Sequence, residues 1–216
     1  MTYQLAIFDL DGTILDTIED LAAGVNHGLI QSGFPCRTVE EIRQFVGNGI
    51  RRTIEQAVPP HTCTAEFERI YADFAAYYPA HCAERTRPYP GLPALMERLH
   101  RAGIAAAVVT NKSQNSAQIL CDTFYPGVFT PVIGEQPGHP RKPDPSGVHS
   151  VLDTLSIPKQ QAVYIGDSDV DIATAHNAGL PCIGVSWGFR GRAFLEAHGA
   201  DFIADTADEL AALLRP

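Results

Sequence analysis

Short apolar runs alternate with amphipathic stretches along most of this chain, and the pattern predicts strands and helices in alternation. The first run, Leu5–Phe8, ends at two acidic residues, Asp9 and Asp11. An apolar run of this length, bounded by a turn signal, indicates a buried strand of a parallel sheet. The other expected strands cover residues 104–109, 130–134, 162–165, 182–185 and 202–204.

Amphipathic stretches separate these later strands and predict helices. They cover residues 92–101, 113–121, 145–155, 169–178 and 207–214. Strands that alternate with helices imply βαβ units with right-handed crossovers. The pattern therefore predicts an α/β fold, with a doubly wound parallel sheet between helices.

The stretch between the first strand and the rest of this pattern is helical throughout. Apolar residues follow helical spacing up to a stop at Gly33, and Thr38 with Glu41 forms a capping box that opens a second helix. Two further helices are expected, at residues 50–58 and from a cap at Thr64 onward. We therefore expect an all-helical domain at residues 17–83, inserted into an α/β domain made of residues 1–16 and 84–216.

Composition excludes several classes of function. The formal net charge is −9 and the chain has only three lysines, which argues against nucleic acid as a partner. Five scattered cysteines without a C-x-x-C pair argue against disulfides and a thiolate zinc site. The sequence shows no membrane-spanning run and no signal peptide, so we expect a cytoplasmic protein. For its oligomeric state we expect a monomer or a homodimer.

The ends of the expected strands carry the candidate chemistry. Asp9 and Asp11 follow the first strand, Thr110 and Asn111 the second, and an acidic group the fourth, with Lys142 in the preceding loop. The acidic group consists of Asp167, Asp169 and Asp171. In a doubly wound sheet these ends converge on one crevice. Crowded carboxylates repel unless a cation offsets them, and Mg²⁺ prefers carboxylates, waters and phosphate oxygens.

These four segments, taken in order, resemble the four motifs of the haloacid dehalogenase superfamily. They are Asp9–Thr13, Val109–Asn111, Lys142–Pro143 and Gly166–Asp171. The resemblance covers essentially the whole chain. It implies a Rossmann-like core, and it identifies the helical insertion as a cap domain.

The resemblance implies phosphatase chemistry. Asp9 would attack the phosphorus of a phosphate monoester and form an aspartyl-phosphate. Asp11 would protonate the leaving alcohol and then activate the hydrolytic water. Thr110 and the backbone of Asn111 would hold the phosphoryl oxygens, and Lys142 would offset the negative charge.

The same resemblance implies a Mg²⁺ site formed by Asp9, Asp11 through its carbonyl, and Asp167. Asp171 matches the second acid of the fourth motif, as a ligand, as a support of the metal through water, or as a residue that orients Lys142. Asp169 is an extra carboxylate that is interpreted as a helix cap, with support of the metal as the alternative. Lys112 is left open between a solvated residue and a member of the site.

Further residues are assigned to substrate binding. Gly12 and Thr13 belong to the first motif. In the cap, Gly47-Asn48-Gly49 followed by Arg51 and Arg52, together with residues 87–91, resembles the phosphoglycolate phosphatase subgroup. Arg51 would bind a substrate carboxylate, and the two glycines would let backbone amides approach the substrate. The simpler interpretation is a helix-breaking turn followed by a surface arginine.

Several alternatives remain open at this point. Asp11 argues against haloacid dehalogenases, since release of a halide needs no proton, and a cap without lysine argues against phosphonoacetaldehyde hydrolases. A phosphoglucomutase-type mutase, a pyrophosphatase and a nucleotidase share the motifs. A protein that binds phosphorylated metabolites and regulates a partner without catalysis is the alternative from another class. We expect a small phosphorylated metabolite as substrate, with 2-phosphoglycolate preferred.

Overall fold

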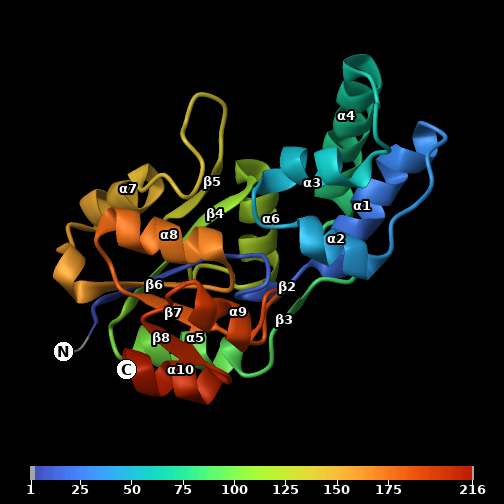
Figure 1. The fold of residues 1–216 in the computed structure, drawn as a ribbon. Coiled ribbons are helices and arrows are strands. Elements are labelled where there is room, and N and C mark those ends of the chain that lie inside the picture. The colour runs from blue at the N-terminus through green and yellow to red at the C-terminus, as the bar shows by residue number, and fades with distance from the viewer. Residues whose placement is uncertain (1–2, 216) are drawn as a thin grey trace. The chain divides into compact units, whose positions relative to one another are not determined.

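The computed structural model describes residues 3–215, which form two compact units (Figure 1). One unit comprises the chain up to Asp16 and from Pro88 onward, and the other comprises Thr17–Arg87. Two short strands, β2 (Leu15–Asp16) and β3 (Arg87–Pro88), pair with each other where the chain passes from one unit to the other. Within residues 3–215, no helix has the length and apolarity needed to cross a membrane.

The first unit contains a six-stranded sheet in the order β5-β4-β1-β6-β7-β8, and all its pairings are parallel. The strands are β1 (Leu5–Phe8), β4 (Ala105–Ser113), β5 (Val132–Glu135), β6 (Ala162–Gly166), β7 (Cys182–Val185) and β8 (Phe202–Ala204). Leu5 pairs with Ala105 of β4 on one side and with Ala162 of β6 on the other. The strand order reverses beside β1, which confirms the predicted doubly wound α/β fold.

Helices cover both faces of this sheet, and their apolar sides form the core with the strands. The helices are α5 (Leu92–Arg101), α6 (Gln114–Phe124), α7 (Ser146–Leu155), α8 (Asp169–Ala178), α9 (Arg192–Ala197) and α10 (Ala207–Leu214), with a short 3₁₀ turn at Lys159–Gln161. Side chains of α7, α8 and α9 form one apolar cluster with Leu5 and Ile7 of β1, whereas α5 and α10 pack together on the opposite face (Figure 1). The pattern of the sequence predicted these helices except α9 and the 3₁₀ turn.

The second unit consists of four helices. They are α1 (Ile18–Gln31), α2 (Val39–Phe45), α3 (Gly49–Ala57) and α4 (Thr64–His81). The capping box of Thr38 and Glu41 forms as predicted, but the cap of α4 is Cys63 and not Thr64. Helices α1 and α4 pack closely, and Gly28 makes this approach possible. A Cβ atom at Gly28 would lie only 2.8 Å from the carbonyl oxygen of Ile70.

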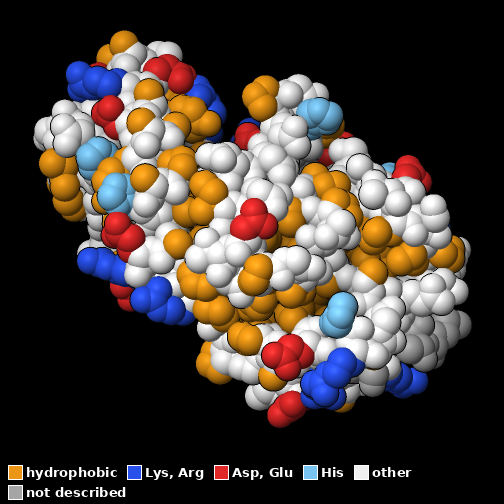
Figure 2. Space-filling model, turned by 180° about the vertical axis from the view of Figure 1, so that it is seen from behind, with side chains coloured by type: hydrophobic (Ala, Val, Ile, Leu, Met, Phe, Trp, Pro, Cys, Tyr) orange, Lys and Arg blue, Asp and Glu red, His pale blue; other side chains and the backbone are white. Residues whose placement is uncertain are grey.

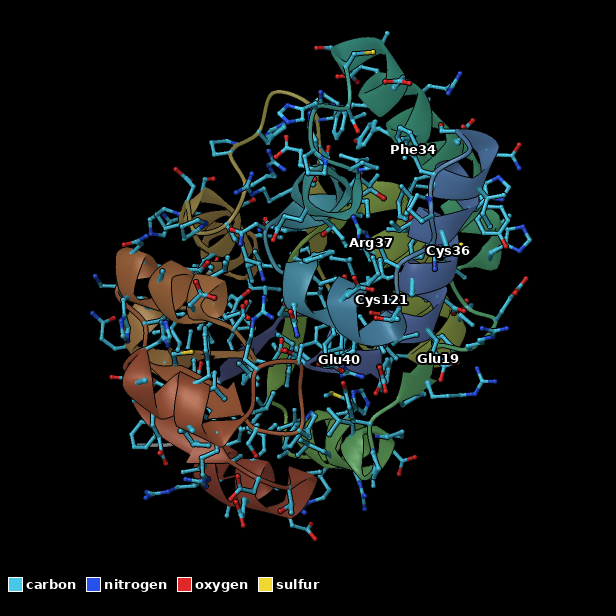
Figure 3. All side chains as sticks on the ribbon, turned by 45° about the vertical axis from the view of Figure 1, so that its right-hand side comes forward. Glu19, Phe34, Cys36, Arg37, Glu40 and Cys121 are labelled. Atoms are coloured by element: carbon cyan, nitrogen blue, oxygen red, sulfur yellow. The ribbon has the colours of Figure 1, made fainter. Side chains whose placement is uncertain are left out.

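The segment between α1 and α2 is attached to the rest of the helical unit through Arg37 (Figure 3). The guanidinium Nε donates to the carbonyl of Ala57 at 2.6 Å, and the backbone N–H of Arg37 donates to the side chain of Asn26 at 2.8 Å. These hydrogen bonds tie Asn26 in the middle of α1 and the last residue of α3 to one loop. Some backbone groups in this region have no hydrogen-bonding partner within a helix, and these bonds supply the missing partners.

Residues 84–87 belong to the helical unit, whereas the sequence placed them in the α/β domain. The reason is Asp20 of α1, whose buried carboxylate accepts hydrogen bonds from the backbone N–H groups of Arg85 and Thr86 and from the hydroxyl of Thr86. These bonds join residues 65 and 66 positions apart, and no local pattern reveals them.

Replacing Asp20 with Ala is expected to destabilise the protein by roughly 2–4 kcal/mol, because it leaves three donors near the buried site without an acceptor. Urea denaturation followed by circular dichroism measures the change. Glu40→Ala is the matched control, since Glu40 is exposed and forms an ion pair with its helix neighbour Arg43. Equal stability of the two variants would contradict the role given to Asp20.

Candidate active site

Three parallel strands bring the predicted catalytic residues together at one edge of the sheet. Asp9 directly follows β1, Asp167 directly follows β6, and Thr110 and Asn111 lie in the last part of β4. The register between β4 and β5 shifts between Val109 and Ser113, and such an irregularity re-aims the side chains that follow it. The four polar residues are all buried, although they lie next to loops.

Asp9, Asp167 and Asp171 form a buried carboxylate cluster, with one oxygen of each within 4.8 Å of the others. Burial, together with the neighbouring charges of Asp171 and Asp11, raises the pKa of Asp9 to about 6 against the opposing effect of Lys142. Burial, followed by Asp171 and Asp9, also raises the pKa of Asp167 well above its usual value. Three acids in one low-dielectric site disfavour one another's charge.

Lys142 lies among these acids. Its Nζ atom is 2.9 Å from Oδ1 of Asp9, 2.7 Å from Oδ1 of Asp171 and 3.0 Å from the hydroxyl of Tyr164. Burial alone would lower the pKa of Lys142, but Asp171 and Asp9 raise it well above its usual value. The ammonium group is therefore charged and partly offsets the carboxylates. Tyr164 is a site residue that the sequence analysis missed, because a tyrosine inside an apolar strand gives no sign that its hydroxyl meets a lysine.

The side chain of Asn111 holds the loop that carries Lys142. Its Nδ2 atom donates to the carbonyl of Lys142 at 3.1 Å, and its Oδ1 atom accepts from the N–H of Lys142 at 2.9 Å. The side chain thus binds both the N–H and the carbonyl group of Lys142, and this fixes the position from which the lysine side chain extends. Any contact of Asn111 with a phosphoryl oxygen falls to its backbone, as the sequence analysis proposed.

Asp171 orients both Lys142 and the start of α8. Its Oδ2 atom accepts hydrogen bonds from the hydroxyl of Ser168 at 2.6 Å and from the N–H groups of Ser168 and Asp167. Ser168 is the cap of α8 and forms a capping box with Asp171. The interpretation of Asp169 as the cap is therefore wrong, because Asp169 already occupies the first position of the helix.

Lys112 is part of the site and is not solvated. Its side chain is only 4% exposed, and Nζ lies 2.9 Å from Oδ1 and 3.2 Å from Oδ2 of Asp11. The side chain of Asp11 is 14% exposed. Each of the two buried lysines thus has its own acid of the first motif, with Lys142 at Asp9 and Lys112 at Asp11.

A loop after β7 closes on Asp167, and no pattern in the sequence predicted this contact. The N–H of Phe189 donates to Oδ2 of Asp167 at 2.7 Å, and the hydroxyl of Thr13 donates to Oδ1 at 3.2 Å. A Cβ atom at Gly188 would lie 2.3 Å from Cβ of Asp167, and one at Gly12 would lie 2.4 Å from its Oδ2. Gly12 also has a φ of +82°, so its conformation and its surroundings both require glycine. The only sequence signal was a Trp-Gly pair at the end of an expected strand.

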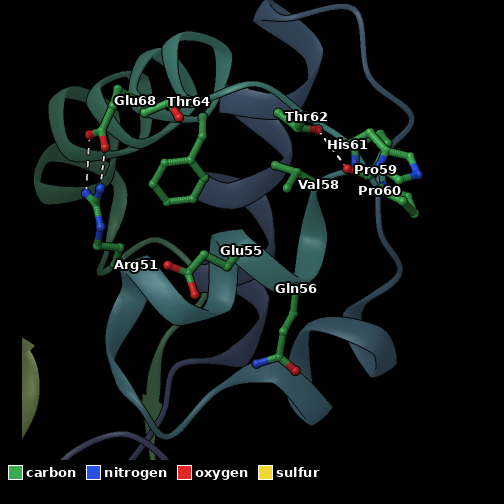
Figure 4. A pocket seen from close by; sticks show the side chains of 11 residues that line it. Arg51, Glu55, Gln56, Val58, Pro59, Pro60, His61, Thr62, Thr64 and Glu68 are labelled. Atoms are coloured by element: carbon green, nitrogen blue, oxygen red, sulfur yellow. Dashed lines mark hydrogen bonds and ion pairs between the residues drawn. The ribbon is translucent and has the colours of Figure 1, made fainter.

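The predicted substrate-binding residues of the helical unit lie at the start of α3. Gly47 and Gly49 have φ values of +130° and +78°, and Asn48 is the cap of the helix. Arg51 forms an ion pair with Glu68 of α4 and stacks on Phe67, with 4.8 Å between the guanidinium carbon and the ring centroid (Figure 4). Arg51, Phe67 and Glu68 line a cavity of about 560 Å³ within the helical unit, whereas residues 47–49 are not part of its lining. A substrate carboxylate that binds Arg51 therefore has to compete with Glu68.

Comparison with known proteins assigns the family. The sequence matches the haloacid dehalogenase-like hydrolases over residues 6–185. The chain belongs to this family. A phosphoglycolate phosphatase from Pseudomonas fluorescens (strain Pf0-1) is 34% identical over 193 residues, which cover 86% of this chain and 70% of the relative.

Solved structures place the fold in the same family. A candidate phosphoglycolate phosphatase from Lactobacillus delbrueckii subsp. bulgaricus is 37% identical with a TM-score of 0.92, and the match covers 99% of each chain. CbbY from Rhodobacter sphaeroides, solved in complex with phosphate, is 26% identical with a TM-score of 0.80 over the full length of both chains. The resemblance stated from the four motifs is thus confirmed, and the haloacid dehalogenase-like hydrolase described here is a phosphatase.

Phosphatases of this family generally use a divalent metal, and the acidic cluster of this hydrolase fits one. Within residues 3–215, Oδ1 of Asp9 is a buried oxygen that receives no directed hydrogen bond, although the ammonium of Lys142 lies 2.9 Å away. The available donors are carboxylate oxygens, which hard cations prefer. A cation would also offset the repulsion that raises the pKa values of Asp9 and Asp167.

Proposed function

We propose that this protein is a Mg²⁺-dependent phosphatase that hydrolyses small phosphate monoesters, with 2-phosphoglycolate as its preferred substrate. The observation that carries the chemistry is the position of Asp9, a buried carboxylate between Lys142 and the other two acids of the cluster. The substrate is proposed from the phosphoglycolate phosphatases that this chain resembles, one of them 34% identical.

Asp9 acts as the nucleophile in the proposed reaction. One of its carboxylate oxygens forms a bond to phosphorus while the bond from phosphorus to the ester oxygen breaks, and the electron pair stays on that oxygen. Asp11 gives the leaving oxygen its proton, and later takes a proton from the water that cleaves the aspartyl-phosphate. The products are inorganic phosphate and the free alcohol, and Asp9 is regenerated.

The surrounding residues stabilise the charge that develops on the phosphoryl oxygens. Lys142 holds its ammonium at Asp9, and the hydroxyl of Thr110 lies buried at the end of β4. Positioned charges account for most of the acceleration in phosphoryl transfer. Asp9, Asp167 and the carbonyl of Asp11 would hold Mg²⁺, with Asp171 behind them, and the metal would supply Lewis-acid stabilisation of phosphoryl charge.

Gly12, Thr13 and the residues Gly47–Gly49 are proposed to contribute to substrate binding together with Arg51. For Gly12 and Thr13, the contacts with Asp167 support a place beside the phosphoryl group. For the helical unit, the support is the resemblance of its sequence to the phosphoglycolate phosphatase subgroup. The guanidinium of Arg51 is the group suited to a carboxylate.

Arg51→Ala is expected to raise KM for 2-phosphoglycolate by about tenfold or more while KM for ethyl phosphate changes little, because only the first substrate carries a carboxylate. Steady-state kinetics on both substrates measures the difference. Arg52→Ala is the matched control, since Arg52 pairs with its helix neighbour Glu55 on the surface. Equal effects of Arg51→Ala on the two substrates would refute carboxylate binding by Arg51.

Phosphate release from a panel of monoesters tests the proposed function. The panel contains 2-phosphoglycolate, glycerol phosphate, sugar phosphates, nucleotides and pyrophosphate, each with Mg²⁺ and with a chelator. A strong preference for 2-phosphoglycolate that is lost on chelation supports the proposal in full. Activity spread over sugar phosphates or nucleotides would keep the chemistry and discard the substrate, and absence of release from every member would refute phosphatase activity.

A further inference from the structure

Lys112 forms a buried ion pair with Asp11 that the motif-based mechanism leaves without a role. Its Nζ atom contacts both carboxylate oxygens, at 2.9 and 3.2 Å, and its side chain is only 4% exposed. Burial of a lysine carries a desolvation penalty of several kcal/mol, so such a pair is weak evidence for stability by itself. The chain places it at the acid that the proposed function needs for proton transfer.

The backbone around Lys112 directs the ammonium toward the site. Thr110, Asn111 and Lys112 follow one another where β4 loses its regular register with β5. The backbone N–H of Lys112 donates to the hydroxyl of Thr110 at 3.3 Å. Three consecutive side chains thus reach into the site, with Thr110 placed for the phosphoryl group, Asn111 at the loop of Lys142, and Lys112 at Asp11.

The two ends of the pair differ in how firmly the chain holds them. Lys112 extends from a strand of the sheet, and its side chain is enclosed. Asp11 lies in the turn after β1, directly before Gly12 with its left-handed backbone. The ammonium is a charged donor in contact with both carboxylate oxygens, so it holds the carboxyl group of Asp11 at a defined position.

We propose that Lys112 is a positioning residue that holds the carboxyl group of Asp11 in line with the ester oxygen of the substrate. The inference rests on the proposed function, in which Asp11 protonates the leaving alcohol. A proton donor has to lie within hydrogen-bonding reach, about 2.6–3.2 Å, of the atom that receives the proton. Displacement of a reacting group by about 1 Å can cost roughly 100-fold in rate. Lys112 itself neither gains nor loses a proton in this step.

The leaving group of the substrate provides the test. Ethyl phosphate and 2-phosphoglycolate release an alkoxide that needs a proton, whereas p-nitrophenyl phosphate releases a stable phenolate that leaves without one. The quantity to compare between substrates is kcat/KM, because it reports the steps up to release of the alcohol. In Lys112→Met, we expect losses of roughly 30- to 100-fold on both alkyl phosphates and less than about threefold on p-nitrophenyl phosphate.

Matched variants separate positioning from structure. Asp11→Asn should show the same dependence on the leaving group, and adding Lys112→Met to it should cost less than about twofold, since residues that act as a unit are not additive. Lys112→Arg should recover part of the loss and is the second variant if Lys112→Met does not fold. Lys159→Met is the control, because Lys159 is the third lysine of the chain and is exposed.

Three outcomes would overturn the proposal. Equal losses of Lys112→Met on all three substrates, with a full further loss in the Asp11→Asn background, would show a structural role. A loss confined to 2-phosphoglycolate and expressed in KM would show that Lys112 binds the substrate carboxylate. Wild-type protein that hydrolyses none of the three substrates would refute the proposed function itself, and the role of Lys112 with it.

Discussion

Asp9→Asn is expected to lower kcat for every monoester by a factor on the order of 10⁴ or more, because an amide does not replace a carboxylate as nucleophile. The shape of the side chain stays the same, so the loss reports chemistry and not packing. Acid quenching during turnover of a phosphate-labelled substrate should trap a covalent label on the wild-type protein and none on the variant.

Thermal unfolding serves as the control for Asp9→Asn. Burial and the neighbouring acids raise the pKa of Asp9 to about 6, so removal of the charge should leave the melting temperature of the metal-free protein unchanged or higher. Turnover of more than a few per cent by the folded variant, or a covalent label on it, would contradict the assignment of Asp9 as nucleophile.

Asp167→Asn is expected to stabilise the metal-free protein while it abolishes the response to Mg²⁺. Asp167 is buried with Asp9 and Asp171 and its pKa is well above the usual value, so the folded protein either confines a charge or takes up a proton. An asparagine avoids both costs and can keep the contacts with Phe189 and Thr13, since an amide both accepts and donates. We expect a gain of roughly 1–3 kcal/mol.

The gain from Asp167→Asn should grow with pH. The folded-state pKa of Asp167 is raised above its unfolded value, so the wild-type carboxyl binds more protons in the folded state, and its contribution to stability is lost as pH rises through the folded-state pKa. The difference in melting temperature between variant and wild type should therefore be larger at pH 8 than at pH 5, without metal in either sample.

Calorimetry with and without Mg²⁺ measures the second half of this prediction. Mg²⁺ should raise the melting temperature of the wild type and leave that of Asp167→Asn unchanged, because a ligand that binds only the folded state stabilises it. Asp208→Asn is the control, since Asp208 is almost fully exposed and lies far along the chain from the acidic cluster. An undiminished response of Asp167→Asn to Mg²⁺ would refute Asp167 as a metal ligand.

On the face drawn in Figure 2, Lys and Arg side chains stand apart from one another and are interspersed with Asp and Glu. The formal net charge is −9. The buried lysines Lys112 and Lys142 pair with the two acids of the first motif, Asp11 and Asp9. This arrangement suits a small anionic substrate that meets a few fixed cations.

The amino-acid sequence by itself determined the architecture and the set of acids. Apolar runs and amphipathic stretches predicted all six strands of the large sheet and most of its helices, because local periodicity and turn residues reflect which side of each element is buried. The order of the four motifs predicted that Asp9, Asp167 and Lys142 meet, because parallel strands end at a common edge.

Only the tertiary structure decided which side chains pair. The contact of Lys112 with Asp11 joins positions 101 residues apart, and the loop at Phe189 reaches Asp167 across 22 residues. The ion pair of Arg51 with Glu68 depends on how α3 packs on α4. Such contacts depend on crossover geometry, an irregular strand end and side-chain direction, and none of these leaves a periodic trace in the chain.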